Sequence, residues 1–233
     1  MGERLAIGLM TGTSIDGVDA AAVVVDGHGL GMRVKVIGHD FAPLGDLAVA
    51  LRALASGERM AASEVAQMAL ELGTRLADAA GMLAMRLGRG APALIAAHGQ
   101  TVFHDPPRSW QLINAAPIAK LGCPVVFDLR AADLAAGGQG APITPLADFV
   151  FFRDESRGVA VVNLGGFCNV TVIPERAGRS LEDGAGEGEG MDVGAGNQGG
   201  GGGAGRGRAA RLAPARMQSC AGWGGAAGAG AAL

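Results

Sequence analysis

The feature that most constrains the fold is a hairpin pattern near the N-terminus, in the stretch GLMTGTSIDGVDAAAVVVDG. Leu5–Met10 and Val18–Val25 are apolar runs of strand length, and the Thr11–Gly17 turn between them is rich in glycine, hydroxyl and aspartate residues. This pattern predicts two neighbouring β-strands. A similar pattern returns in GVAVVNLGGFCNVTVIP, at Gly158–Pro174. We therefore expect two lobes that each begin with a hairpin.

Strand and helix patterns alternate between the two hairpins. Met32–Leu44 predicts a third strand, and Ser63–Leu87 predicts a helix because its apolar residues recur every three or four positions. Ser63 is placed to cap the first turn of that helix. Two short buried strands are predicted further on, at ALIAA before His98 and at Pro124–Phe127. Hairpin strands first and strand–helix alternation afterwards predict an α/β protein.

We expect three regions along the 233 residues of the chain. Residues 1–155 would form a first lobe and residues 156–198 a partial second lobe, with the boundary in the charged stretch Arg153–Arg157. Residues 199–233 form a low-complexity tail in which 23 of 35 residues are glycine or alanine. Glycine loses the most conformational entropy on folding, so this tail is expected to be disordered.

Composition excludes several classes of function. A net charge of -3 argues against nucleic-acid and anionic-membrane partners. No apolar run reaches the roughly 20 residues of a membrane span, and the N-terminus lacks the features of a signal peptide. The three cysteines, Cys123, Cys168 and Cys220, are far apart and form no metal-binding pair, which fits a reducing compartment. We therefore expect a cytoplasmic protein whose partners are small molecules.

The turn TGTSIDG has two interpretations. Its glycines permit the backbone conformations that let several N–H groups converge on a phosphate, and its hydroxyls add donors. Asp16 and Asp19 would repel a phosphate directly, but they suit a Mg²⁺ placed between them and the phosphates. The alternative is a surface turn, which prefers the same residue types. No lysine follows the glycines, so the stretch is not a Walker A loop.

Polar residues follow both short predicted strands, where open α/β sheets bind ligands. The first strand leads into HGQT, in which His98 and Gln100 can hydrogen-bond a polar ligand, although a lone histidine at a strand end is more often structural. The second strand is followed by Asp128, Arg130, Asp133 and Gln139. These residues form either a ligand site or a network of ion pairs. Asp192 lies further on, in the glycine-rich loop GMDVGAGNQ.

Five stretches, taken in this order, resemble the anhydro-N-acetylmuramic acid kinases: GLMTGTSIDGVDAA, HGQTVFH, PVVFDLRAADLAAGGQGAPITP, VNLGGFCNVT and GMDVGAGNQ. The resemblance runs from Leu5 to Gln198. This family belongs to the sugar-kinase, Hsp70 and actin-like ATPases. The resemblance therefore implies an α/β fold of the actin-like ATPase (ribonuclease H-like) type, with lobe I complete and lobe II only begun.

The resemblance also implies ATP and Mg²⁺ as cofactors. The family's phosphate loop matches the first turn, so the residues expected at the ATP phosphates are Gly12, Thr13, Ser14, Ile15, Asp16, Gly17, Val18 and Asp19. The second hairpin would add Gly165 and Gly166. Asp16 and Asp19 would hold Mg²⁺ through water.

The family's HGQT and AGGQGAP loops face its sugar cleft. The expected substrate residues are His98, Gln100, Thr101, Asp128, Arg130 and Gln139. The family's catalytic aspartate matches Asp192, with Val193 and Ala195 in place of the usual threonine and proline.

The implied reaction opens a 1,6-anhydro sugar and phosphorylates it. Such a sugar has no free 6-hydroxyl, so a general base, here Asp192, must activate water to attack the anomeric carbon. The released O6 then accepts the γ-phosphoryl group of ATP. The products would be N-acetylmuramic acid 6-phosphate and ADP, in the recycling of cell-wall fragments.

The sequence departs from the family pattern in three places that matter, one of them the stretch RSLEDGAGEGEG, which looks looser than a strand leading to the catalytic loop. In WQLIN, Ile113 stands where the family has glycine. The match ends at Gln198, although the family continues much further, which suggests a truncated or frameshifted gene. We therefore keep a second hypothesis, a non-catalytic remnant that binds sugar or phosphate at most, and expect a weakly folded region from Gly158 on. Full-length relatives are often dimeric.

Overall fold

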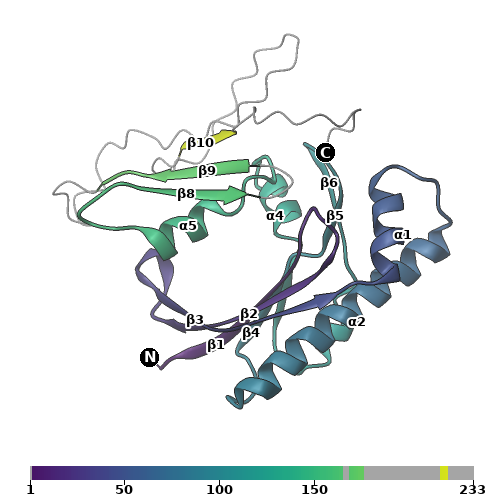
Figure 1. Ribbon diagram of the computed structural model, residues 1–233, viewed down its shortest axis with the longest axis horizontal. Coiled ribbons are helices and arrows are strands. Elements are labelled where there is room, and N and C mark those ends of the chain that lie inside the picture. Colours follow the sequence, from purple (N-terminus) through teal and green to yellow (C-terminus); the bar gives the residue numbers. More distant parts are fainter. Residues whose placement is uncertain (1, 165–167, 176–215, 220–233) are drawn as a thin grey trace, which may run out of the picture. The chain divides into compact units, whose positions relative to one another are not determined.

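A computed structural model describes residues 2–164, 168–175 and 216–219 (Figure 1). The chain divides into two compact units, one reaching to Ala141 and the other beginning at Pro142. This division lies earlier than the boundary predicted at residue 155, because helix α5 (Pro145–Phe152) packs with the strands that follow it. The assignment of residues 1–155, 156–198 and 199–233 to separate domains stays a prediction.

The first unit is built on a five-stranded mixed sheet in the order β3-β2-β1-β4-β7. The strands are β1 (Arg4–Thr11), β2 (Gly17–Asp26), β3 (Arg33–Pro43), β4 (Leu94–Ala97) and β7 (Val125–Phe127). The first three are antiparallel neighbours, whereas β4 runs parallel to β1 and β7 runs parallel to β4. The predicted hairpin, third strand and two short strands are all confirmed.

Helix α2 (Ala62–Leu87) packs along one face of this sheet, against β1, β2 and β3 (Figure 1). Its buried residues, Met68, Leu72, Leu76, Ala79 and Leu83, recur every three or four positions. They meet the alternate residues of β1 and β2 that point the same way, such as Ile7, Leu9 and Ala20. The predicted helix is confirmed, but the predicted cap is wrong. The helix begins at Ala62, so Ser63 lies inside its first turn, and the Glu64 carboxylate accepts a hydrogen bond from the Ala61 amide at 2.7 Å.

Several elements of the first unit connect these strands. A short 3-10 turn, η1 (Gly29–Gly31), leads into β3, and helix α1 (Asp46–Ala55) precedes α2. A two-stranded hairpin, β5 (Gln100–Asp105) with β6 (Arg108–Leu112), follows β4. Helix α3 (Ala116–Ala119) precedes β7, and helix α4 (Leu129–Ala135) follows it.

The second unit contains α5 and an antiparallel sheet in the order β10-β9-β8. Strands β8 (Val159–Leu164) and β9 (Cys168–Ile173) form the second predicted hairpin. Strand β10 (Arg216–Ser219) pairs with β9, so these residues form a strand where the sequence predicted disorder. The pairing explains the difference, since β9 would otherwise leave one row of backbone groups unbonded. The rest of the predicted disordered tail lies outside the described residues.

No helix in the described part of the chain combines the length and the apolar character needed to cross a membrane.

Candidate functional site

The parallel strands of the first unit bring three candidate segments to one edge of its sheet. Leu9 pairs with Ala97, and Ala97 pairs with Phe127, so β4 and β7 end at the same level and β1 continues two residues beyond it, to Thr11. The turn after β1, His98 after β4 and Asp128 after β7 therefore share the carboxyl edge, which is where open α/β sheets bind ligands.

The turn between β1 and β2 is tightly built. The Ile15 amide donates to the Gly12 carbonyl at 3.2 Å, and the Leu44 amide donates to the Asp16 carbonyl at 3.0 Å. Ile15 has a φ of 50°, which is rare for a β-branched residue, and its side chain is only 5% exposed. At Gly17, a Cβ atom would lie 2.2 Å from ring carbons of Phe41, so this position has no room for a side chain. Packing on both sides thus holds the turn in one conformation.

Hydrogen-bond donors in this turn converge on the carboxylate of Asp16. The Ser14 hydroxyl donates to its Oδ1 atom at 2.6 Å. This bond, followed by backbone N–H groups of Asp16 and Gly17, lowers the pKa of Asp16 below its ordinary value. The Ser14 hydroxyl is thus bonded to an anionic group, and backbone N–H groups near that group stabilise its charge. Those are the donors expected to face a phosphate.

The side chains of the other predicted phosphate residues differ in exposure. Thr13 and Asp19 are exposed, whereas Val18 is in the core with 1% exposure. Ile15 and Val18 therefore present only their backbone groups to a ligand. Gly165 and Gly166, predicted for the second phosphate turn, lie outside the described residues, as does Asp192.

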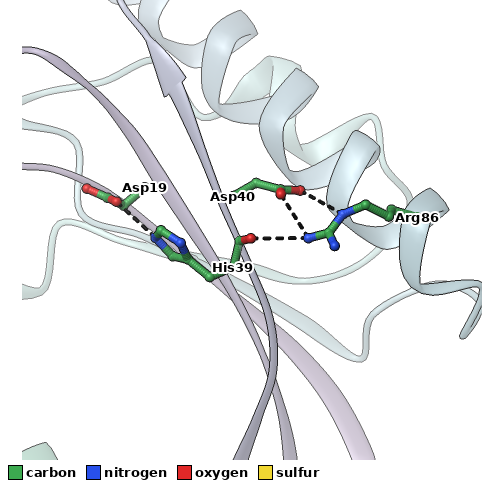
Figure 2. Close-up of polar contacts among 4 residues, drawn as sticks. All are labelled: Asp19, His39, Asp40 and Arg86. Atoms are coloured by element: carbon green, nitrogen blue, oxygen red, sulfur yellow. Dashed lines mark hydrogen bonds and ion pairs between the residues drawn. The ribbon is translucent and has the colours of Figure 1, made fainter.

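Asp19 has a partner on the neighbouring strand. Figure 2 shows its carboxylate beside His39, whose Nε2 atom lies 3.0 Å from Oδ1 of Asp19. Asp40 follows His39 on β3, and both residues are bound by Arg86 of α2. The Arg86 guanidinium donates to the two carboxylate oxygens of Asp40 at 2.8 and 3.2 Å and to the His39 carbonyl at 3.1 Å. The strand that carries the partner of Asp19 is thus tied to α2.

The predicted Mg²⁺ site is not supported by a cluster of ligands. Within the residues that the structure describes, no group of three or more His, Cys, Asp or Glu side chains is placed to hold a metal ion. A Mg²⁺ that keeps several waters needs only one or two carboxylates, and the exposed Asp16 carboxylate has the right chemistry.

A residue that the sequence did not single out, Arg52 of α1, contacts this turn. Its Nη2 atom donates to the carbonyl of Ile15 at 2.8 Å and to that of Ser14 at 3.1 Å, and its Nε atom lies 3.4 Å from the same Ser14 carbonyl. Spacing of Leu47, Leu51 and Leu54 in the sequence is the signal that could have predicted α1. Nothing in the sequence indicates that its arginine reaches back to the turn.

The segment after β4 is hydrogen-bonded directly to the β1 strand end. The His98 amide donates to the Leu9 carbonyl at 2.9 Å, and the Thr11 hydroxyl donates to the Gly99 carbonyl at 2.8 Å. Gly99 has a φ of 76° and packs against Ile113, whose Cβ would lie 3.1 Å from a Cβ built at Gly99. Ile113, the departure from the family pattern, therefore lies against the predicted sugar segment.

His98 and Arg130 meet at the carboxyl edge. The Nδ1–H group of His98 donates to the Gly99 carbonyl at 3.1 Å, and its Nε2 atom accepts from Nε of Arg130 at 3.1 Å. Burial, together with the charge of Arg130, lowers the pKa of His98 below its ordinary value of 6.5, although the Gly99 bond and Asp128 oppose this. His98 is therefore neutral, with its proton on Nδ1.

Arg130 also reaches the glycine-rich loop after α4. Its Nη1 atom donates to the Gly140 carbonyl at 2.8 Å, and the Gly140 amide donates to the Asp133 carboxylate at 2.7 Å. Asp128 caps α4 by accepting from the Ala131 amide at 3.3 Å. The structure thus brings together His98, Arg130 and this loop through hydrogen bonds to an imidazole and to backbone groups, and none of the ion pairs of the described residues joins Arg130 to Asp128 or Asp133.

The remaining predicted sugar residues are placed differently. Gln100 is 1% exposed, donates to the Thr101 carbonyl at 3.1 Å and leaves its Oε1 atom without a hydrogen-bond partner. The Thr101 hydroxyl lies 3.4 Å from the amide nitrogen of Gln111. Gln139 is exposed in the loop between α4 and Gly140.

An α/β fold with a mixed sheet, and with polar residues at the carboxyl ends of its parallel strands, fits the sugar-kinase and actin-like class of proteins. The family model described as anhydro-N-acetylmuramic acid kinase matches residues 4–198. The chain belongs to this family.

Curated relatives agree with this assignment. An anhydro-N-acetylmuramic acid kinase of Picosynechococcus sp. is 39% identical over 177 residues, which cover 73% of this chain and 46% of the relative. Kinases of the same name from Gluconobacter oxydans and Salinibacter ruber are 40% and 42% identical, over 73% and 75% of this chain and 48% of each relative. The chain thus spans about half the length of the curated relatives that it matches.

Proposed function

We propose that this chain belongs to an ATP-dependent kinase that opens 1,6-anhydro-N-acetylmuramic acid and phosphorylates its O6. The products are N-acetylmuramic acid 6-phosphate and ADP. Family membership over residues 4–198 supports the proposal. In this proposal the first unit is lobe I of a two-lobed, actin-like ATPase that works in the cytoplasm on cell-wall fragments, and the second unit begins lobe II.

The observation that carries the proposal is the turn between β1 and β2. The Ser14 hydroxyl already donates to one carboxylate, that of Asp16, and the nearby N–H groups of Asp16 and Gly17 lower the pKa of that carboxyl. A phosphate of ATP needs the same convergence of donors, held in place before it binds. The buried Ile15 side chain and the close contact at Gly17 provide that rigidity.

The resident metal in this proposal is Mg²⁺, which Asp16 and Asp19 would hold through water. It would supply positive charge to the phosphates during transfer. The lowered pKa of Asp16 keeps its carboxylate ionised, and Ser14 orients one of its oxygens.

The sugar would lie at the same edge of the sheet, near His98 and Arg130. The neutral His98 accepts a hydrogen bond from Arg130, and Arg130 is fixed at its other end by Gly140. A guanidinium fixed in this way can orient a carboxylate such as the lactyl acid of the muramic sugar. Gln100, Thr101, Asp128 and Gln139 complete the proposed sugar set. Asp192 would be the general base that activates the attacking water.

Turnover of 1,6-anhydro-N-acetylmuramic acid with ATP tests this proposal. The purified chain is expected to release ADP and the 6-phosphate together, and Asp192→Asn is expected to lower the rate by about a hundredfold or more. Asp78→Asn, which changes an exposed carboxylate on α2, is the matched control and should leave the rate unchanged.

Binding of ATP and of the sugar, each measured by calorimetry, distinguishes the active kinase from the second hypothesis, a non-catalytic remnant. Binding of either ligand without turnover would favour the non-catalytic remnant. Neither binding nor turnover would contradict both functions for this chain.

A further inference from the structure

The guanidinium of Arg52 binds two consecutive carbonyl groups in the turn between β1 and β2. Its Nη2 atom lies 2.8 Å from the Ile15 oxygen and 3.1 Å from the Ser14 oxygen. A planar guanidinium presents several N–H groups in a fixed fork, so it can meet two neighbouring acceptors at once. A lysine ammonium has no such fork.

The turn needs an external restraint of this kind. Ile15 has a φ of 50°, a conformation that L-residues with branched side chains rarely adopt. Such conformations persist only where the surrounding structure fixes them from several sides. Around Ile15 those restraints are its buried side chain, the bond from its amide to Gly12, and the two bonds from Arg52.

Helix α1 delivers Arg52 to this place. Leu47, Ala48 and Leu51 of the helix are buried in the core, so the helix is fixed one residue before the arginine. Arg52 itself is exposed along most of its length, but its contact with Ile15 is partly buried. The arginine is thus carried by a rigid element and not by a loop.

The bonds to Arg52 decide which way the backbone amides point. In a trans peptide the carbonyl and the N–H of the next residue point in opposite directions. Because the Ser14 and Ile15 carbonyls point toward Arg52, the N–H groups of Ile15 and Asp16 point away from it. The Ile15 N–H group donates to the Gly12 carbonyl, which closes the turn, and the Asp16 N–H group is left on the side of the Asp16 carboxylate, whose pKa it lowers.

We propose that Arg52 is a positioning residue for the phosphate-binding turn: it holds the Ser14 and Ile15 carbonyls so that the turn's donors face the phosphate. This inference rests on the proposed function. Arg52 acts through the backbone and makes no contact with the phosphate itself.

The experiment compares the full chain with Arg52→Ala, Arg52→Lys and Arg75→Ala. Arg75 is an exposed arginine of α2 paired with Glu71 at 3.2 Å, so its loss controls for removal of one positive charge. Hydrogen–deuterium exchange measures the Thr11–Gly17 turn, and calorimetry measures binding of inorganic tripolyphosphate, which has no nucleoside to bind elsewhere.

Arg52→Ala is expected to raise exchange in the turn alone and to weaken tripolyphosphate binding by about tenfold, as loss of a charged hydrogen bond does. Added guanidinium should restore binding to this variant. Arg52→Lys should restore little, and Arg75→Ala should match the unsubstituted chain.

Three results would overturn the inference. Unchanged tripolyphosphate affinity in Arg52→Ala would remove the positioning role. Full affinity in Arg52→Lys, with exchange of the turn still raised, would mean that residue 52 touches the phosphate directly. Faster exchange throughout β1, β2 and β4 would mean that Arg52 only stabilises the fold. Failure of turnover alongside normal tripolyphosphate results would instead contradict the proposed kinase function and leave the role of Arg52 in the turn intact.

Discussion

The two ring nitrogens of His98 have different partners. The protonated Nδ1 donates a hydrogen bond to the Gly99 carbonyl, and Nε2 accepts one from the Arg130 guanidinium. Both bonds, at 3.1 Å, require the neutral ring with its proton on Nδ1. Protonation of Nε2 would place two donors face to face and add a charge next to Arg130. Protonation of His98 at low pH would therefore break its hydrogen bond with Arg130 at the carboxyl edge of the sheet.

Acidification is expected to destabilise the first unit through His98. Its pKa is lower in the folded chain than its ordinary value of 6.5, so below about pH 6.5 the unfolded chain binds more protons and the free energy of unfolding falls. Urea unfolding at about pH 7.5 and about pH 5.5 measures this loss.

His98→Gln should reduce the difference between the two pH values by no more than the uptake of one proton allows. The part that remains comes from His104, whose pKa is also lowered by burial and by Arg130. At about pH 7.5 the histidine is neutral, so any difference in the free energy of unfolding between His98→Gln and the unsubstituted chain at that pH reflects lost packing and not titration. An unchanged pH dependence in His98→Gln would contradict the assignment of the neutral ring.

At the scale of elements, helix α2 contains two glycines with opposite surroundings. A Cβ at Gly73 would lie 2.0 Å from the Asn114 carbonyl oxygen, whereas at Gly81 the nearest atom is 3.8 Å away. The Asn114 amide also donates to the Ala69 carbonyl at 3.2 Å, so the backbone before α3 runs directly against the helix. Position 73 therefore requires glycine because the Asn114 backbone lies too close for a side chain, whereas position 81 has room for one.

Alanine at these two positions should have effects of opposite sign. Gly73→Ala forces the backbone apart and is expected to lower the free energy of unfolding by about 2 kcal/mol. Gly81→Ala removes a poor helix former and is expected to raise it by up to about 1 kcal/mol. Denaturant midpoints at unchanged slope give both values. Equal effects at the two positions would show that the contact with Asn114 is not tight.

The sequence predicted the elements whose patterns are long and local. Helix α2 and strands β1 and β2 carry regular apolar periodicity, so their existence followed from spacing alone. The start of α2 was misplaced because a serine near a helix start resembles a cap, while the actual bond comes from Glu64 to the Ala61 amide. The β5–β6 hairpin and α1 were missed because the first mixes polar and apolar residues and the second is short.

The candidate site was predictable only as a set of residue types. The sequence placed His98 and Arg130 after two strands, but their contact joins residues 32 positions apart and depends on the parallel pairing of β4 with β7. Arg52 lies 38 positions from Ser14 and left no local signal at all. Contacts of this kind arise from tertiary packing, which a single sequence does not display.

At the scale of the whole molecule, the parts of the two units whose side chains the structure describes differ in how much they bury. The first has a continuous core built from β1, β2, β4, α1 and α2. Among residues 142–163 and 170–175 of the second, the buried side chains are those of Pro145, Thr171 and Ile173, while Phe151 and Phe152 are exposed. Thr171 is fixed by a 2.7 Å hydrogen bond to Asp148. A polar contact of this kind contributes less stability than a large apolar core.

The second unit is therefore expected to open more readily than the first. Native-state hydrogen exchange should show amides of β8 and β9 exchanging about tenfold or more faster than those of β1 and β2. Measurement at two chain concentrations controls for protection by association. Equal protection of both hairpins would contradict the difference in stability and with it the expectation of a weakly folded region from Gly158 on.

The bonds that join Thr11 to Gly99 and Leu9 to His98 have a consequence for the entropy of binding. They connect the turn between β1 and β2 to the segment at His98 and Gly99. The two segments therefore lose their conformational freedom relative to one another when the sheet folds. A ligand that touches both meets groups that are already fixed with respect to one another. Its affinity is then not reduced by the cost of ordering them, which is the thermodynamic meaning of a preorganised site.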